Sequence, residues 1–367
     1  MKIGEKMELA KEDVKILPDV PECNGEDVLN RRGFAERLAL KLVDYKDPDC
    51  LIVGIHGPWG SGKTTFLGYL ESKLSTRGED AIIVHFNPWN FSTVDQLIAM
   101  FFSEMRLAIH SGKGLRETSL KIGRALECLG KILAPVEAAI SIIKLPSGLV
   151  IPSGISPAFE KAGSAFKDLA EQDPSNLKKE INKLLCEYDK KIIILIDDID
   201  RLDKESMRLM FRLIRLNADF INTIYILSFD RGVVEGALQG EQSGSGREYL
   251  EKFIQVPFDL PLPDRNKIIK ILMEQIIRIL PPPAQSEFER YRWDSFSSGF
   301  YSLLKTLRDV KRYINGLQLT LPSINDEINY RDFIALEAIR IFEQDVYGKI
   351  ATYKEILLGN KPSYSLD

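Results

Sequence analysis

Residues 50–64 read CLIVGIHGPWGSGKT, an apolar run of strand length followed by a glycine-rich loop. A helical stretch continues from this loop to about Leu74. Residues 57–64 fit the pattern GxxxxGK[ST] at every fixed position, and they have the strand before and the helix after that the motif requires. This agreement argues against a chance glycine turn. The stretch therefore predicts a phosphate-binding loop in an α/β protein.

The chemistry of the loop follows from its residue types. Glycines let the main chain turn tightly, so that several N–H groups face phosphate oxygens, and the helix N-terminus adds a favourable dipole. Lys63 is expected to act on the β- and γ-phosphates, and the Thr64 hydroxyl to bind Mg²⁺. Thr65 either touches the α-phosphate or is an ordinary helix residue. The predicted nucleotide-binding residues here are Gly57, Pro58, Trp59, Gly60, Ser61, Gly62, Lys63, Thr64 and Thr65.

A second motif, KKIIILIDDIDRL, ends a predicted strand with an acidic pair. Five consecutive apolar residues, 192–196, are typical of a strand buried on both faces. Ligands of open α/β sheets bind at the carboxyl ends of strands. We expect Asp197 to hold Mg²⁺ through water and Asp198 to be the base that orients or deprotonates the attacking water. The alternative is a pair of solvated turn residues that cap the next helix. Asp200 and Arg201 are expected to form a local ion pair.

The rest of the chain alternates strands and helices and then becomes helical. Residues 81–89 and 220–230 read as further strands, and the chain is helical by period from about 265. This order indicates an α/β P-loop NTPase core, a three-layer parallel sheet, with a C-terminal all-helical lid domain. The expected divisions are an extended lead-in (1–25), the α/β domain (26–264, with an insertion at about 111–175) and the helical domain (265–367).

Composition narrows the function classes. Hydrophobic residues make up 44% of the 367 residues, which excludes a mainly disordered chain. The formal net charge of −4 gives no general attraction to nucleic acid or anionic lipid, so nucleic acid is an unlikely partner. The cysteines and histidines are scattered, which favours a reducing compartment over a zinc site or a disulfide framework. The charged N-terminus has no apolar signal region. A cytoplasmic protein is expected.

The insertion at 111–175 is rich in small residues and proline. Its most apolar part is broken by prolines and by Lys131, Glu137 and Lys144, so it does not read as a membrane-spanning helix. Short helices and loops are expected. A hydrophobic hairpin on a partner or a membrane surface is the alternative, which leaves peripheral membrane association open.

Taken together, these motifs resemble the KAP family of P-loop ATPases, in the ASCE/STAND-related division. The likeness covers roughly residues 25–345, and the order and spacing of its blocks are fairly specific. The blocks that carry it are DVLNRRGFAERLA, GPWGSGKTT, HFNPWNF, IIILIDDIDRL, LSFDRGVVEGAL, REYLEKFIQVPFDLP and TLRDVKRYINGL. Members often have membrane-spanning helices between the two phosphate motifs, and this chain departs from the family there.

The resemblance implies further site residues. Asp230 matches a catalytic, sensor-like position beside the γ-phosphate, with Ser228 as its rival. Arg31 matches a residue near the base or ribose, and Arg308 the arginine of the helical lid that reaches the nucleotide. The remaining residues to which the likeness points are Lys311 and Arg312 as alternatives to Arg308, Asn87 and Trp89 in the pocket wall (Trp89 equally well in the core), and Arg247 or Lys252 as a finger for a neighbouring protomer.

The predicted function is ATP binding and Mg²⁺-dependent ATP hydrolysis by a nucleotide-driven conformational switch, with ATP and Mg²⁺ as cofactors. A protein partner or a homo-oligomer is expected. The family resemblance implies a process such as signalling, complex assembly or anti-phage defence. Two alternatives remain, an ATP-binding interaction module with little turnover and a P-loop small-molecule kinase. The doubled aspartate and the long helical C-terminus argue against the kinase.

Overall fold

The computed structural model of the 367-residue chain forms two compact units. One unit contains residues 21–261, and the other contains 1–20 together with 262–367. The structure describes residues 16–17, 27–77, 81–91, 93–111, 116–134, 173–188, 190–240, 245–280, 299–300, 302–323 and 329–359. The predicted domain limits stay a prediction.

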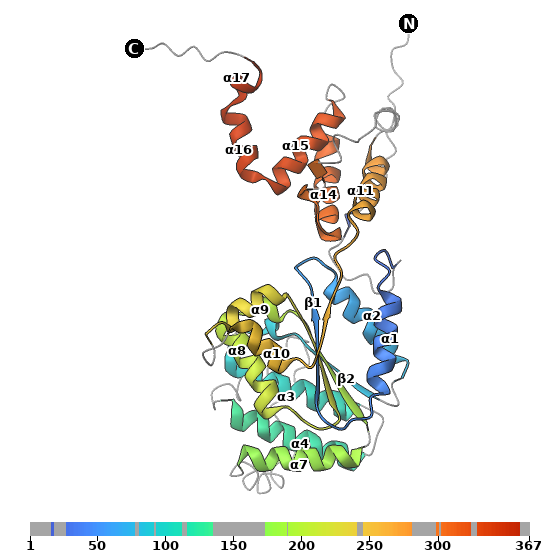
Figure 1. Cartoon of the computed structure of the whole chain (residues 1–367), viewed down its shortest axis with the longest axis vertical. Coiled ribbons are helices and arrows are strands. Elements are labelled where there is room, and N and C mark those ends of the chain that lie inside the picture. Colours follow the sequence, from blue (N-terminus) through green and yellow to red (C-terminus); the bar gives the residue numbers. More distant parts are fainter. Residues whose placement is uncertain are drawn as a thin grey trace, which may run out of the picture. The chain divides into compact units, whose positions relative to one another are not determined.

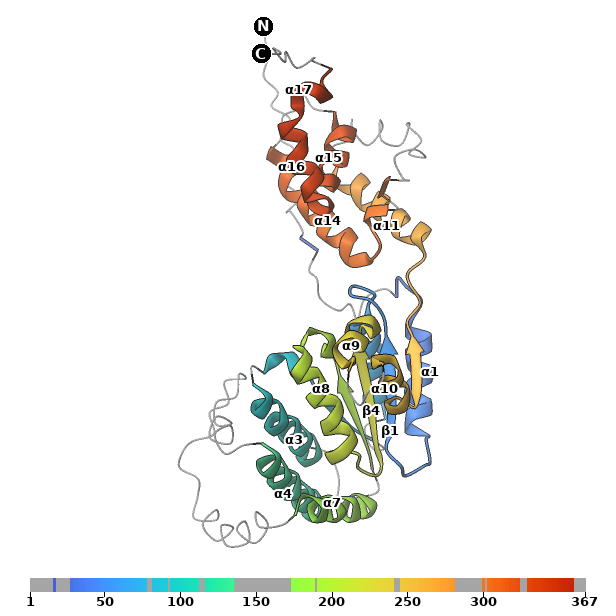
Figure 2. The same cartoon turned by 60° about the vertical axis from the view of Figure 1, so that its left-hand side comes forward.

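The α/β unit is built on a five-stranded parallel sheet (Figures 1 and 2). Its strands are β1 (Leu51–His56), β2 (Ala81–Phe86), β3 (Lys191–Ile196), β4 (Thr223–Phe229) and β5 (Val256–Asp259), in the spatial order β2-β3-β4-β1-β5. The apolar runs of β1, β3 and β4 are buried almost throughout, because helices cover both faces of the sheet. The predicted three-layer parallel α/β core is confirmed.

The strand order places two distant segments at one edge. β4 lies between β1 and β3 and pairs with both of them. Parallel strands end at the same edge of a sheet, so the loop after β1 and the acidic pair after β3 flank the end of β4. This is the crevice that open α/β sheets use for ligands.

Two helices cover one face of the sheet. They are α1 (Arg32–Val43) and α2 (Lys63–Ser75). Their apolar sides, which include Leu38, Phe66 and Leu70, pack with Val53 and Ile226 of the sheet in one buried cluster.

A larger set of helices packs in the other main cluster of the unit. It consists of α3 (Val94–Ser111), α4 (Arg116–Leu133), α7 (Pro174–Tyr188), α8 (Lys204–Arg212), α9 (Arg231–Leu238) and α10 (Gly246–Phe253). After α8 the chain makes a π-helical turn, η3 (Leu213–Asn217).

The start of the predicted insertion differs from the expectation of short helices and loops. Residues 116–133 form the 18-residue helix α4, which buries Ile122, Leu126 and Leu129 against its neighbours α3 and α7. These residues lie at helical spacing, so the segment belongs to the core. The proline-rich part of the insertion, 135–172, lies outside the described residues. In the described part of the chain, no helix is both long and apolar enough to cross a bilayer.

The second unit is helical. It contains α11 (Arg265–Ile279), α14 (Leu307–Thr320), α15 (Tyr330–Phe342), α16 (Gln344–Thr352) and α17 (Lys354–Leu357). α11, α14 and α15 share one apolar core, in which the Tyr313 hydroxyl donates to the Ile334 carbonyl over 2.5 Å. Asn315 of α14 exchanges two hydrogen bonds with the main chain of Leu17. The helical composition predicted for this region is confirmed.

Candidate functional site

The loop between β1 and α2 is shaped by glycines. Gly60 and Gly62 have φ angles of 77° and 90°, a region that side chains other than glycine rarely adopt. A Cβ on Gly57 would lie 2.6 Å from Oγ of Ser61, so the chain also needs glycine for space there. The sequence thus folds into a tight turn that leads directly into the N-terminus of α2, where anions bind well.

Lys63 opens α2 and lies inside the turn. Its residue is 8% exposed, and Nζ donates to the carbonyl of Gly57 at 2.9 Å and to that of Pro58 at 3.4 Å. Oδ2 of Asp200 lies 3.7 Å from the same nitrogen. A buried ammonium needs such partners. The loop therefore holds this charge in place at the edge of the sheet.

Arg31 is hydrogen-bonded to the main chain of the loop. It is buried, and its guanidinium donates to the carbonyls of Ser61 and Pro261. A Cβ on Gly62 would lie 2.9 Å from Nη1 of Arg31. Burial lowers the pKa of the guanidinium, against the opposing effect of Asp27. The role near the base or ribose stays a prediction.

The loop after β1 and the acidic pair after β3 meet at one hydrogen bond. The Thr64 hydroxyl, in the first turn of α2, donates to Oδ2 of Asp197 over 2.7 Å. Oδ1 of Asp197 is buried without a hydrogen-bond partner among the described residues. A hydroxyl and a carboxylate with a spare buried oxygen form a donor set that suits Mg²⁺. Thr64 and Asp197, the residues predicted to bind the metal, are therefore placed so that they could share one Mg²⁺.

Asp198 is held by two side chains. Its Oδ2 accepts from Nδ2 of Asn87 at 2.9 Å, and its Oδ1 lies 2.8 Å from Nε of Arg201. Burial raises the pKa of this carboxyl, while the Asn87 hydrogen bond and Arg201 oppose the rise. The predicted ion pair between Asp200 and Arg201 is wrong, because Arg201 pairs with Asp198.

Asp200 turns inward instead. Its side chain is 9% exposed, and Oδ2 accepts from the main-chain N–H of Asp230 at 3.1 Å as well as lying near Lys63. Asp200 therefore links the loop after β3 to the loop after β1 and the end of β4. No spacing rule in the sequence marks this contact, since it depends on the strand order.

Asp230 and Ser228, near the end of β4, differ in whether their side chains have hydrogen-bond partners. Oδ1 of Asp230 accepts from the N–H of Gly232 at 2.9 Å and caps α9. Ser228 is fully buried, and its Oγ has no hydrogen-bond partner in the described part of the chain. Both lie at the edge that carries the two motifs. The sensor role of Asp230, with Ser228 as its rival, stays a prediction.

The other predicted residues are spread over the two units. Trp59 and Trp89 are exposed, so Trp89 is not a core residue. Thr65 lies in the first turn of α2. Arg308, Lys311 and Arg312 are on α14 in the helical unit, and Arg247 and Lys252 are on α10, where Arg247 pairs with Glu251. Their roles toward a nucleotide stay predictions.

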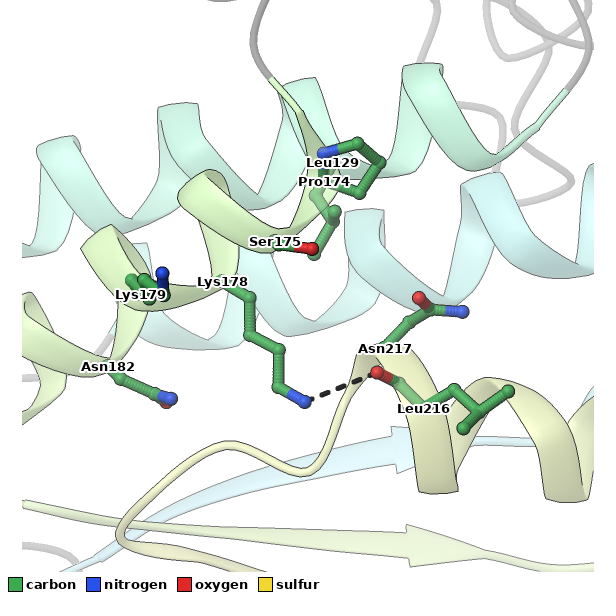
Figure 3. A pocket seen from close by; sticks show the side chains of 8 residues that line it. All are labelled: Leu129, Pro174, Ser175, Lys178, Lys179, Asn182, Leu216 and Asn217. Atoms are coloured by element: carbon green, nitrogen blue, oxygen red, sulfur yellow. Dashed lines mark hydrogen bonds between the residues drawn. The ribbon is translucent and has the colours of Figure 1, made fainter.

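A cavity of about 320 Å³ lies apart from these residues, between α4, α7 and η3 (Figure 3). Lys178 crosses it to donate to the Leu216 carbonyl at 3.2 Å and also pairs with Asp219. None of the predicted site residues lines it. The candidate site remains at the carboxyl edge of the sheet.

Comparison with known proteins identifies the family of the chain. Residues 31–324 match the model of the KAP family P-loop domain. The chain belongs to the KAP family. The KAP chain is 26% identical over 347 residues to the phage T7 exclusion protein of Escherichia coli K12. The alignment covers 90% of this chain and 46% of that protein. It thus spans about half the length of that relative.

Two solved structures show more distant likeness to this KAP chain. The Aeropyrum pernix ORC1 protein in complex with DNA is 16% identical, with a TM-score of 0.45 over 94% of this chain and 74% of that chain. Domain III of the Thermotoga maritima replication initiation protein DnaA is 15% identical, with a TM-score of 0.37 over 90% and 98%. TM-scores this low say nothing about the function of the KAP chain.

Proposed function

We propose that this KAP protein binds ATP with Mg²⁺ at the loop 57–64 and hydrolyses it as a conformational switch. The observation that carries the proposal is the 2.7 Å hydrogen bond from Thr64 to Asp197, which joins the two phosphate motifs. Lys63, the loop N–H groups and a spare oxygen of Asp197 all lie at the same edge. This combination suits a triphosphate and a hard cation.

Each residue has a chemical task in this proposal. The loop N–H groups and Lys63 bind the β- and γ-phosphates, and Thr64 and Asp197 hold Mg²⁺, which neutralises phosphate charge when bound. Asp198 accepts a hydrogen bond from the attacking water and orients it. Burial raises the pKa of Asp198, which makes its carboxylate a better proton acceptor than an exposed one. Asp230 and Arg308 stay proposed sensors, and Arg31 shapes the loop.

A nucleotide-holding module with little turnover is the second candidate. It is favoured by the engagement of both Asp198 oxygens, by Asn87 and by Arg201. The two candidates share the binding site and differ in whether water is activated.

We also propose a cytoplasmic setting, a 26–264 nucleotide domain with a 265–367 lid, and a protein partner or a second copy. The name of the phage exclusion relative favours anti-phage defence among the processes considered.

One experiment separates the candidates. ATP affinity and phosphate release are measured for the wild type, Lys63→Ala and Asp198→Asn, with exposed Lys183→Ala on α7 as a matched control. Lys63→Ala should abolish tight binding, while Asp198→Asn should keep binding and lose phosphate release. Equal phosphate release by the wild type and Asp198→Asn removes Asp198 from the mechanism. Undiminished affinity of Lys63→Ala contradicts the binding site.

A further inference from the structure

A closed ring of contacts surrounds the Asp198 carboxylate. Nε of Arg201 contacts Oδ1 at 2.8 Å, and Nδ2 of Asn87 donates to Oδ2 at 2.9 Å. Oδ1 of Asn87 accepts from the main-chain N–H of Trp89 at 3.0 Å. The guanidinium of Arg201 lies 5.1 Å from the centre of the Trp89 ring, within cation–π range. Trp89 therefore contacts both groups that hold Asp198.

The backbone conformation brings these residues together. Asp198 has a φ angle of 59° and is followed by a 3-10 turn, η2 (Ile199–Arg201), which brings Arg201 back over the residue three positions earlier. Asn87 and Trp89 belong to the turn after β2. The strand β2 itself pairs with β3, and the last pair in the register is Phe86 with Ile196. Neighbouring strands thus deliver the two halves of the ring to one place.

The ring joins a sheltered carboxylate to an exposed aromatic side chain. The side chain of Asp198 is 17% exposed and that of Arg201 is 35% exposed. Trp89 is 55% exposed, although a tryptophan side chain is usually well covered. Its indole can therefore be displaced from outside without opening the core. Such a displacement acts on Arg201, whereas the contact to Asn87 is made by the main-chain N–H of Trp89 and remains.

We propose that Arg201 and Trp89 are positioning residues that hold Asp198 at rest, and that displacement of the Trp89 indole frees the carboxylate to orient water. This inference rests on the proposed ATP hydrolysis. A carboxylate held through both oxygens by a guanidinium and an amide has less freedom to turn toward a substrate water. Asn87 alone still holds Oδ2 when Arg201 leaves, so the carboxylate keeps its place and gains a free oxygen.

The test compares steady-state ATP hydrolysis by the wild type, Arg201→Ala, Trp89→Ala and the double variant. Arg201→Ala and Trp89→Ala should each raise kcat about fivefold at unchanged KM for ATP, since one charge-assisted contact is lost without change at the phosphates. The double variant should equal Arg201→Ala, because Trp89 acts through Arg201. Arg201→Lys should lie between the wild type and Arg201→Ala. Exposed Arg124→Ala on α4 is the matched control, and far-UV circular dichroism checks folding.

The outcomes are distinct from those that test hydrolysis itself. A wild type that hydrolyses ATP together with unchanged or lower kcat in Arg201→Ala overturns the positioning role and leaves the ATPase standing. Nucleotide binding without turnover in every variant overturns both the ATPase and the restraint. Turnover in Arg201→Ala but not in the wild type supports both. A change in KM in place of kcat assigns these residues to nucleotide binding and overturns the inference.

Discussion

The Thr64 hydroxyl donates to Oδ2 of Asp197 over 2.7 Å, although the two lie 133 positions apart in the sequence. β4 lies between the strands that precede them, so no direct pairing of β1 with β3 produces the contact. It arises because both strands end at the same edge of a parallel sheet and because α2 begins directly at that edge. The relationship defines a place where a hydroxyl and a carboxylate can share one cation.

Thr64→Val should remove most of the gain in ATP affinity that Mg²⁺ provides. Valine keeps the shape of threonine and loses the oxygen ligand, so we expect Mg²⁺-dependent affinity to fall about tenfold. Affinity measured in EDTA should change little, because the loop N–H groups and Lys63 remain. Titration calorimetry with and without Mg²⁺ measures both values. Thr76→Val, at the other end of α2, is the matched control. If Mg²⁺ raises the ATP affinity of Thr64→Val as much as that of the wild type, Thr64 is not a ligand of the metal.

Asp200→Ala should destabilise the α/β unit. The nearly buried carboxylate accepts from the partly buried Asp230 N–H and lies 3.7 Å from Nζ of the buried Lys63, so its removal takes this partner from both donors. We expect a loss of about 2 kcal/mol in the free energy of unfolding. Asp200→Asn keeps an acceptor oxygen and should lose less. Urea unfolding of the wild type and the two variants gives the order of their stabilities. An alanine variant as stable as the wild type contradicts a stabilising role for the contacts of Asp200 with Lys63 and Asp230.

The two motifs can be recognised in the sequence because each depends on local chemistry. A loop that wraps phosphate needs glycines at fixed offsets. Two carboxylates directly after a buried strand cost free energy unless they have partners or a ligand, so the pair marks a site. The parallel sheet follows from the alternation of strands and helices. In α4 the helical spacing of Ile122, Leu126 and Leu129 carries the same kind of signal, but the small residues around it favour loops.

The partners of Asp198 and Asp200 could not be read from the chain. Residues adjacent in sequence, such as Asp200 and Arg201, point in different directions in a 3-10 turn, whereas residues three apart are superposed. Arg201 therefore reaches Asp198, and Asp200 turns toward Lys63. The Asn87 contact depends on β2 lying next to β3, and strand order is a property of the whole sheet.

Stability should fall as the pH drops below neutrality, and His56 should account for part of this. His56 is 3% exposed at the end of β1, and burial lowers its pKa from 6.5 despite the nearby Asp259. Below about pH 6.5 the unfolded chain therefore binds a proton that the folded protein resists, which favours unfolding. Urea midpoints at pH 7.5 and 5.5 should differ less in His56→Gln than in the wild type. An equal pH dependence in the two proteins refutes this role.

Two glycines of the α9–α10 region should respond oppositely to alanine. A Cβ on Gly246 would lie 1.9 Å from the Glu235 carbonyl oxygen, whereas a Cβ on Gly236 meets nothing within 4 Å. Gly246→Ala should cost at least about 2 kcal/mol, because main-chain atoms must move. Gly236→Ala, inside α9, should stabilise by about 0.5–1 kcal/mol, because alanine favours helix. Thermal unfolding of both variants tests the pair, and a shift of the same sign in both is the contrary result.

We expect Arg31 to hold the shape of the phosphate loop through the geometry of its guanidinium and not through its charge alone. Its guanidinium donates to the carbonyls of Ser61 in the loop and Pro261 after β5, which a lysine cannot bridge in the same way. Arg31→Lys should therefore resemble Arg31→Ala, with ATP affinity reduced about tenfold or more and a loss of about 2 kcal/mol in stability. Exposed Arg37→Ala on α1, the helix that begins directly after Arg31, should match the wild type in calorimetry and urea unfolding. If Arg31→Lys retains wild-type affinity, the side chain acts through its charge, and the two carbonyl contacts do not brace the loop.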